Sequence, residues 1–157
     1  MKILIVYYSR TGNTQKMAEA VKYGVEEEGL EAVLKCVAEA SLDDLIEADG
    51  IILGSPTYYG NMAAEIKRFI DDSVKYHGKL AGKVGGAFTS SGLAGGGNET
   101  TLMALIQAML IHGMVVQGTT RRDHYGPVAV NAPDDTALEN CRALGSRVAT
   151  LARILHG

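Results

Sequence analysis

The chain has 157 residues, of which 46% are hydrophobic and 21% are charged, a composition ordinary for one compact domain spanning residues 1–157. Its formal net charge of −3 argues against a partner that is nucleic acid or an anionic membrane surface. The first apolar run is too short for a membrane span or a signal-peptide leader, so we expect a cytoplasmic protein.

Hydrophobic runs of strand length recur along the chain, and helical patterns lie between them. The predicted strands cover residues 3–8, 32–37, 51–54, 84–88 and 114–116. The predicted helices cover residues 14–28, 42–46, 62–75, 99–112 and 135–155. Nearly continuous apolar strands are typical of a parallel sheet that is covered on both faces. The alternation therefore predicts an α/β fold with a doubly wound sheet.

Local signals support several helix boundaries. Gly29 and Gly113 follow two of the predicted helices, at a position where glycine commonly ends a helix. Pro133 precedes the last helix, and Asp134 or Asp135 is suited to cap its first turn.

Neither of the two cysteines, Cys36 and Cys141, belongs to a CxxC motif or a cluster of metal-binding residues. We therefore expect no disulfide framework, no iron–sulfur cluster and no other metal site. Both are interpreted as buried, reduced thiols, one on a strand and one on a helix face.

The loop after the first predicted strand is rich in hydroxyl groups, since it contains Ser9, Thr11 and Thr14. Gly12 permits close approach of the backbone, and the helix that follows presents unpaired N–H groups, so the loop is suited to bind a phosphate. The alternative is a merely well-capped helix start. The chain lacks the Walker lysine motif and the G-x-G-x-x-G pattern here, which disfavours nucleotide hydrolysis and a Rossmann-type NAD site.

Two further loops carry unusual residues. Residues 54–62 follow a buried strand and contain Pro56 and the adjacent Tyr58 and Tyr59, whose rings suit stacking on a planar isoalloxazine. We expect one tyrosine to meet the ligand and the other to pack on a neighbouring helix. The glycine-rich residues 89–98 let backbone amides approach the polar atoms of a flat heterocycle, a reading compatible with a flexible lid.

Together these loops resemble those of flavodoxin-like FMN proteins. Residues 7–14 (YYSRTGNT) are similar to the flavodoxin phosphate loop. Residues 54–62 (GSPTYYGNM), 90–97 and 112–115 resemble more closely the WrbA type of NAD(P)H:quinone oxidoreductase. The similarity covers nearly the whole chain. It implies the flavodoxin-like fold, a five-stranded parallel sheet of order 2-1-3-4-5 with helices on both faces.

The resemblance also implies where FMN lies, with its phosphate on the first loop and its ring between the other two. The expected cofactor-binding residues are Ser9, Arg10, Thr11, Gly12, Asn13, Thr14, Pro56, Thr57, Tyr58, Tyr59, Gly60, Asn61, Thr89, Ser90, Ser91, Gly92, Leu93 and Gly95. His112 matches a histidine near the flavin of the quinone reductases and is the candidate catalytic residue. An equally weighted alternative is a helix C-terminal histidine favoured by the helix dipole.

Two departures from the family pattern stand out. The connection over residues 36–49 is shorter than in the quinone reductases, where a longer insertion contributes to assembly. Whether the protein forms a homo-oligomer is therefore left open. The third loop lacks the tyrosine that shields one face of the ring in flavodoxin. That face is therefore expected to be accessible to a second planar molecule.

Three functions remain open at this point. The first is an FMN-dependent oxidoreductase that moves a hydride from NAD(P)H toward a quinone-like acceptor, with His112 or Tyr125 as a proton donor. The second is a one-electron carrier that docks on a redox partner protein. The third, a regulatory domain without a cofactor, is the least consistent with three ligand-friendly loops.

Overall fold

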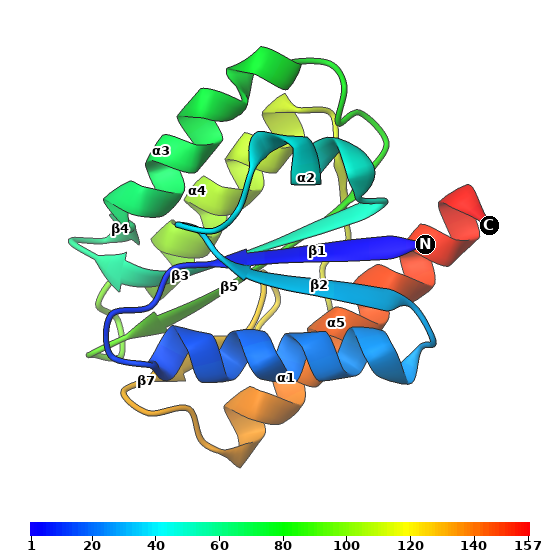
Figure 1. Ribbon diagram of the computed structural model, residues 1–157. Coiled ribbons are helices and arrows are strands. Elements are labelled where there is room, and N and C mark those ends of the chain that lie inside the picture. Colours follow the sequence, from blue (N-terminus) through cyan, green and yellow to red (C-terminus); the bar gives the residue numbers. More distant parts are fainter.

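A parallel sheet forms the centre of the computed structural model, which describes residues 1–157 (Figure 1). Its main path runs in the order β2-β1-β3-β5-β6. The bounds are β1 (Lys2–Tyr7), β2 (Glu31–Cys36), β3 (Gly50–Tyr58), β5 (Val84–Ser91) and β6 (Val115–Val116). Neighbours on this path pair in parallel, and β4 (Asn61–Met62) only forms a hairpin with β3. The predicted order 2-1-3-4-5 is therefore confirmed once the hairpin is left out of the count.

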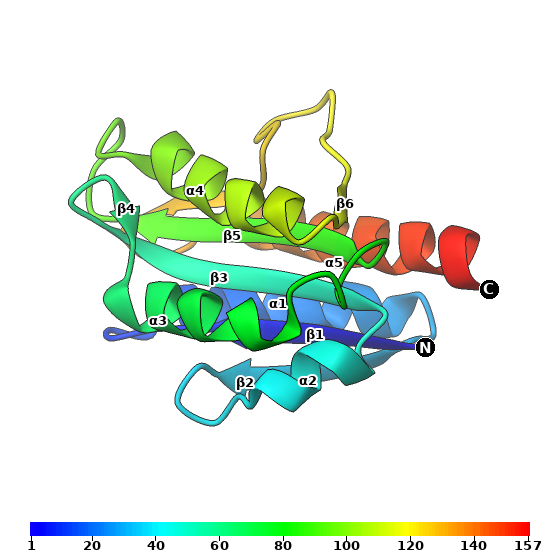
Figure 2. The same cartoon turned by 90° about the horizontal axis from the view of Figure 1, so that it is seen from above.

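Helices cover both faces of this sheet (Figure 2). One face carries α1 (Asn13–Glu27) and α5 (Asp135–His156). The other carries α2 (Leu42–Glu47), α3 (Ala64–Asp72) and α4 (Asn98–Ile111), with a 3₁₀ turn over Ser73–Tyr76 that continues α3. None of these helices has the length and apolar character needed to cross a membrane.

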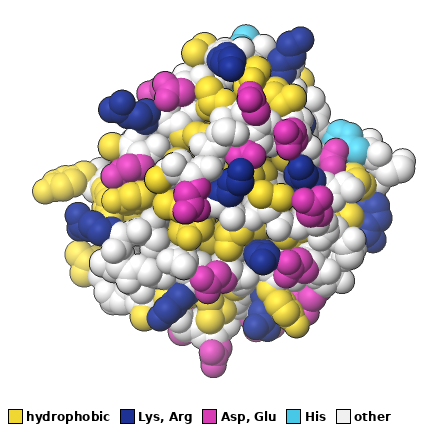
Figure 3. Space-filling model, in the orientation of Figure 1, with side chains coloured by type: hydrophobic (Ala, Val, Ile, Leu, Met, Phe, Trp, Pro, Cys, Tyr) yellow, Lys and Arg dark blue, Asp and Glu magenta, His cyan; other side chains and the backbone are white.

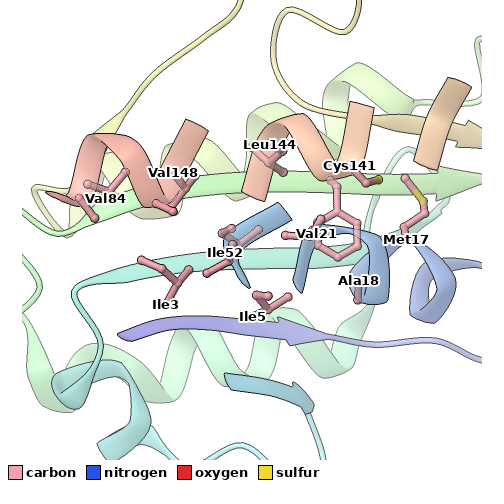
Figure 4. Packing of buried hydrophobic residues seen from close by; sticks show 14 of the residues in the cluster. Ile3, Ile5, Met17, Ala18, Val21, Ile52, Val84, Cys141, Leu144 and Val148 are labelled. Atoms are coloured by element: carbon pink, nitrogen blue, oxygen red, sulfur yellow. The ribbon is translucent and has the colours of Figure 1, made fainter. Parts of the chain in front are cut away.

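Alternating side chains of β1 explain why the sheet needs both layers. Ile3 and Ile5 belong to the core under α1 and α5 (Figure 4), whereas Leu4 and Val6 belong to the core on the opposite face. All four are fully buried. Since successive strand residues point to opposite faces, an uninterrupted apolar run requires cover on both sides.

The segment after Gly54 differs from the predicted loop. β3 continues to Tyr58, and its last two residues pair with β4 in an antiparallel hairpin. The connecting residues, Tyr59 and Gly60, both have positive φ angles, 49° and 77°, as in the type I′ turns that suit two-residue hairpins. Pro56 is tolerated inside the strand because β3 has a neighbour only on its β5 side at this level.

The fifth strand is split into two pieces, of which only the first was predicted. β6 pairs with the beginning of β5, and β7 (Val128–Val130) pairs with its end. Residues 117–127 leave the sheet between them (Figure 2). A three-residue strand shows too little alternation to be recognised in the sequence.

The two cysteines occupy a strand and a helix, as expected. Cys141 on α5 is buried, and burial raises the pKa of its thiol. Cys36 at the end of β2 is only half-buried, because β2 is the edge strand and its side chains lie closer to solvent. The prediction of a buried thiol was therefore wrong for Cys36.

Candidate cofactor-binding site

Three loops meet at the carboxyl edge of the sheet, on the left of Figure 1. They follow β1, β3 and β5 and contain the residues predicted to bind FMN. Two contacts join them. The hydroxyl groups of Thr14 and Ser90 lie 2.8 Å apart, and the Thr100 hydroxyl donates to the Gly60 carbonyl at 2.7 Å. The structure thus brings together residues that are 76 and 40 positions apart in sequence.

The start of α1 is open to an anion. Its N-cap is Gly12, with φ of 91° and no capping side chain, and its first turn has no acidic residue. The Gly12 N–H donates to Ser9 Oγ at 3.1 Å, which closes the loop behind the helix start. Unpaired N–H groups and the helix dipole favour negative charge here. The predicted phosphate loop therefore has the geometry of an anion site.

Thr14 adds a buried hydroxyl to this helix start. A hydroxyl has one proton to donate and also accepts, so Thr14 can accept from Ser90 while it donates to a phosphate oxygen. The remaining members of the loop lie at its rim: Arg10 and Thr11 are exposed, and Asn13, the first residue of α1, is half-buried.

The two adjacent tyrosines have different environments. The ring of Tyr58 lies 6.5 Å from that of Tyr8 in an edge-on arrangement, and the Arg10 guanidinium lies 5.2 Å from its centroid. A hydrogen bond to Glu65 and burial raise the pKa of Tyr8. Tyr59 is fully exposed at the hairpin tip, in a left-handed conformation that is unfavourable for a bulky residue. An aromatic side chain held this way is a candidate for stacking on a planar ligand.

The tip of the third loop carries few side chains. Gly92, Leu93 and Gly95 are exposed, and the Ser91 hydroxyl donates to the Leu93 carbonyl at 2.9 Å. At the base of the loop, a Cβ on Gly97 would lie 2.4 Å from Gly60 Cα, so only glycine allows this close approach to the hairpin. Figure 3 shows hydrophobic side chains projecting at the left margin, where Figure 1 places the hairpin.

Several predicted binding residues serve the framework. Thr89 is fully buried; its hydroxyl donates to the Ser55 carbonyl at 2.7 Å and lies 3.0 Å from the Thr57 hydroxyl, and its N–H donates to Pro127. The fold already uses both donors of Thr89, so its predicted contact with the cofactor has no free donor to supply it. Pro56 is also buried, and Asn61 is exposed with its side-chain oxygen accepting from the Met62 N–H.

His112 does not lie at this edge. It caps the C-terminal end of α4, which begins at the third loop and runs back along the sheet for 14 residues, about 21 Å. Its neighbour Gly113 accepts from the Gly82 N–H, just before the amino end of β5. The His112 Nε2 lies 2.8 Å from the Ser73 hydroxyl, and burial together with His77 lowers its pKa. Within one chain the catalytic assignment of His112 is corrected, because α4 runs antiparallel to the strands.

The alternative proton donor, Tyr125, is exposed on segment 117–127. The adjacent Gly126 packs against the Ala87 carbonyl, so Tyr125 lies beside the middle of β5 and not at its end. Sequence reasoning missed three residues that build the site: Tyr8, Gly97 and Thr100. The sequence pattern indicated that each of these residues lies near the end of a helix or strand. It could not indicate their contacts, because these join segments far apart in sequence.

These features fit FMN. An uncapped helix start suits the phosphate, and the exposed Tyr59 ring beside a bare glycine loop suits a flat ring. The side-chain oxygen of Asn98, at the start of α4, is buried without a partner, so a polar group at this edge is also left for a ligand.

Comparisons with known proteins agree with this geometry. Residues 37–122 match the family NADPH-dependent FMN reductase. A flavodoxin of Aquifex aeolicus is 42% identical, over 94% of this chain and 85% of the relative. An NAD(P)H dehydrogenase (quinone) of Archaeoglobus fulgidus is 32% identical, over 98% of each chain. The solved structure of a flavodoxin, WrbA-like protein from Agrobacterium tumefaciens superposes with a TM-score of 0.86 at 33% identity, over 98% of each chain.

The family match covers more than half of the chain, and the relatives cover nearly all of it at above 30% identity. The chain therefore belongs to the flavodoxin-like family of FMN-binding electron-transfer proteins and stands close to its WrbA-type members.

Proposed function

We propose that this protein is an NAD(P)H:quinone oxidoreductase that works through FMN. The observation that carries the proposal is the open carboxyl edge, where Tyr59 is fully exposed and the tip of the facing loop presents only glycines, Leu93 and Ala94. A ring bound there keeps one face accessible, so a nicotinamide and then a quinone-like molecule can stack on it in turn.

The residues of this chain supply binding and orientation. The first turn of α1 and the Thr14 hydroxyl hold the phosphate, and Tyr59 packs on one face of the ring. Backbone N–H groups of residues 92–95 would donate to ring carbonyl groups and nitrogens, whereas the Gly96 N–H already donates to the Leu93 carbonyl. Bound there, FMN would supply the redox chemistry, namely hydride uptake from NAD(P)H and transfer of two electrons to the acceptor. His112 lies at the opposite end of α4 from the third loop, so we expect acceptor protons to come from solvent.

Anaerobic stopped-flow mixing tests the proposal. The FMN-loaded protein is mixed with NADPH or NADH, and the flavin absorbance is followed before and after benzoquinone is added. We expect bleaching by at least one nucleotide and rapid recovery with the quinone. An absorbance that responds to neither nucleotide, although dithionite bleaches it, would contradict the proposal.

The second candidate is a one-electron carrier for a redox partner protein. It is favoured by chain length. This chain has 157 residues, whereas its alignment with the Archaeoglobus enzyme spans 188 positions, so the chain is shorter than that enzyme. A reductive titration separates the two functions. A carrier takes up electrons in two resolved one-electron steps, whereas the proposed enzyme is reduced in a single two-electron step.

We further propose that residues 1–157 act as one domain in the cytoplasm, where NAD(P)H is available.

Hydrophobic side chains are also exposed around the far ends of α3 and α4, namely Val74, Leu110 and Ile111, which supports self-association through that end. Light scattering of the purified protein at increasing concentration tests this, and a mass that stays monomeric would exclude it.

A further inference from the structure

A second polar cleft lies away from the cofactor edge, between segment 117–127 and α5. Its volume is about 580 Å³, and a single hydrophobic residue lines it. Three arginines, Arg121, Arg122 and Arg147, face only two carboxylates, Asp123 and Glu139. We call it the arginine cleft. A surplus of positive charge is unusual on a chain whose net charge is −3.

The floor of the arginine cleft is one face of α5. Thr136, Asn140, Ala143 and Arg147 follow at intervals of three or four residues, so they share a helix face. The core residues of α5, such as Cys141 and Val148, occupy the face that packs against the sheet. The cleft is therefore built on a rigid helix that the core holds in place.

Arg147 is the unusual member of this set. It is half-buried, its Nε is buried without any hydrogen-bond partner, and burial lowers its pKa. Taking a guanidinium out of water without a counter-ion costs free energy, so such groups are normally paired. None of the ion pairs in the chain involves Arg147, Arg121 or Arg122.

One of the two carboxylates of the cleft is already used. Asp123 accepts from the Asn140 amide at 2.8 Å and, more weakly, from the Val128 N–H at 3.5 Å. These bonds hold Asp123 in a left-handed conformation, with φ of 58°. Asp123 thus shapes the segment that carries Arg121 and Arg122 and forms no ion pair with any of the three arginines.

The segment itself is ordered by its own bonds. The Thr119 N–H donates to the His124 carbonyl at 3.2 Å, and the His124 ring nitrogen lies 2.8 Å from the Thr119 carbonyl. The Arg121 N–H donates to the Thr119 hydroxyl at 3.2 Å. The two arginines at the tip are therefore presented on a closed turn.

We propose that the arginine cleft binds a phosphate-type dianion, held by Arg147 from α5 and by Arg121 and Arg122 from the segment above it. Guanidinium groups bind phosphate oxygens through paired N–H donors, and a terminal phosphate presents three oxygens to the three arginines, whereas a carboxylate presents only two. A concave cleft of this volume suits a small molecule. The dianion comes either from a free phosphate ester or from the 2′-phosphate of NADPH; the second source rests on the function proposed above.

Isothermal titration of the FMN-loaded protein with inorganic phosphate tests the site, because bound FMN already fills the phosphate loop at α1. We expect binding that Arg147→Met weakens about tenfold or more, as expected for loss of one charge-assisted contact. The matched control is Arg142→Gln, also on α5, whose guanidinium lies over Tyr23 and outside the cleft. It should leave phosphate affinity unchanged.

Stability provides a second readout. Without phosphate, Arg147→Met should be as stable as the parent protein or more so, because an unpaired, half-buried charge is removed. With phosphate, only the parent and Arg142→Gln should melt at a higher temperature. Should Arg147→Met fold poorly, Arg147→Lys serves in its place, since it keeps the charge but loses the paired donors. Absence of phosphate binding to the FMN-loaded parent, or equal affinity in parent and both Arg147 variants, would overturn the proposal.

The source is separated with adenosine 2′,5′-bisphosphate and adenosine 5′-monophosphate. Tighter binding of the bisphosphate, lost in Arg147→Met, assigns the site to the 2′-phosphate of NADPH. Equal binding of both nucleotides, with phosphate binding retained, assigns it to a free phosphate ester. Because these titrations measure binding alone, their outcome is independent of whether the protein transfers a hydride.

Discussion

Five helices begin at the carboxyl edge, yet their first turns are built in two ways. α2 begins with a capping box between Ser41 and Asp44, and α5 begins with Asp134 accepting from the Ala137 N–H at 2.8 Å. α1, α3 and α4 begin instead with Gly12, Ala63 and Gly97, and none of them has a capping side chain. These three uncapped starts follow the three loops of the candidate cofactor site, whereas the capped pair lies outside it.

This difference shows where a ligand replaces part of the protein. A side-chain cap contributes about 1 kcal/mol to stability, so leaving three helix starts without one is a cost. The uncapped starts also differ from one another, since α3 and α4 have Glu65 and Glu99 in their first turns and α1 has no acidic residue. The start of α1 is therefore the one suited to the FMN phosphate, and α4 is left to contact neutral parts of the cofactor.

The largest expected effect comes from Gly12→Val. The branched side chain would stand in the phosphate position, so we expect FMN affinity to fall by about a hundredfold or more, as for loss of several charge-assisted bonds. The measurement is a fluorescence titration with FMN. The matched control is Gly29→Val at the other end of α1, because both glycines have positive φ and open space around the Cβ position. Both variants should lose similar stability, and equal FMN affinity in the two would refute the phosphate site.

Tyr59→Asn should affect the ring end of the site in two opposite ways. Asparagine before glycine suits a type I′ turn, so the thermal midpoint should rise, while FMN affinity should fall up to about tenfold through lost stacking. Thermal melts and FMN titration measure the two effects. The control Tyr23→Ala removes another exposed ring, which lies on α1 and away from the hairpin. A variant that becomes more stable and binds FMN as tightly as before would contradict the stacking role.

Asp134→Ala tests the capped side of the comparison. Loss of the α5 cap should reduce the free energy of unfolding by about 1 kcal/mol. FMN affinity should not change, because Asp134 lies outside the three loops. Urea unfolding of the FMN-free protein gives the first quantity and the FMN titration the second. Weaker FMN binding in this variant would show that the two kinds of helix start are not independent.

The smallest effect is expected at His112, which lies near the amino edge. Its lowered pKa means that the unfolded chain binds more protons, so its contribution is present above the ordinary histidine pKa of about 6.5 and is lost as pH falls below it. His112→Gln should therefore flatten the loss of thermal stability between pH 7.5 and 5.5, while the exposed His156→Gln should not. Flavin reduction by NADPH should proceed at the parent rate, and a slowed rate would restore His112 to the catalytic site.

Sequence patterns predicted the elements better than their ends. Periodicity located the buried strands and the long helices, and Gly29, Gly113 and Asp134 marked helix boundaries that the structure confirms. The hairpin after Gly54 and the strand Val128–Val130 were missed, because pairing partners and not local pattern create them. The resemblance placed the three loops at one edge, but it also placed His112 there, which the direction of α4 contradicts.

By itself the sequence determined the sheet, its two helical layers and the hydroxyl-rich, glycine-rich loops that follow the strands, since burial and turn chemistry act over a few neighbouring residues. The tertiary structure alone decided which of those loop residues remain free for a cofactor. The donors of Thr89 are used in bonds to β3 and to Pro127, Tyr58 packs on Tyr8, and Tyr59 is left in solvent. The reason is that a donor's availability depends on what lies opposite it, and the residues opposite come from distant parts of the chain.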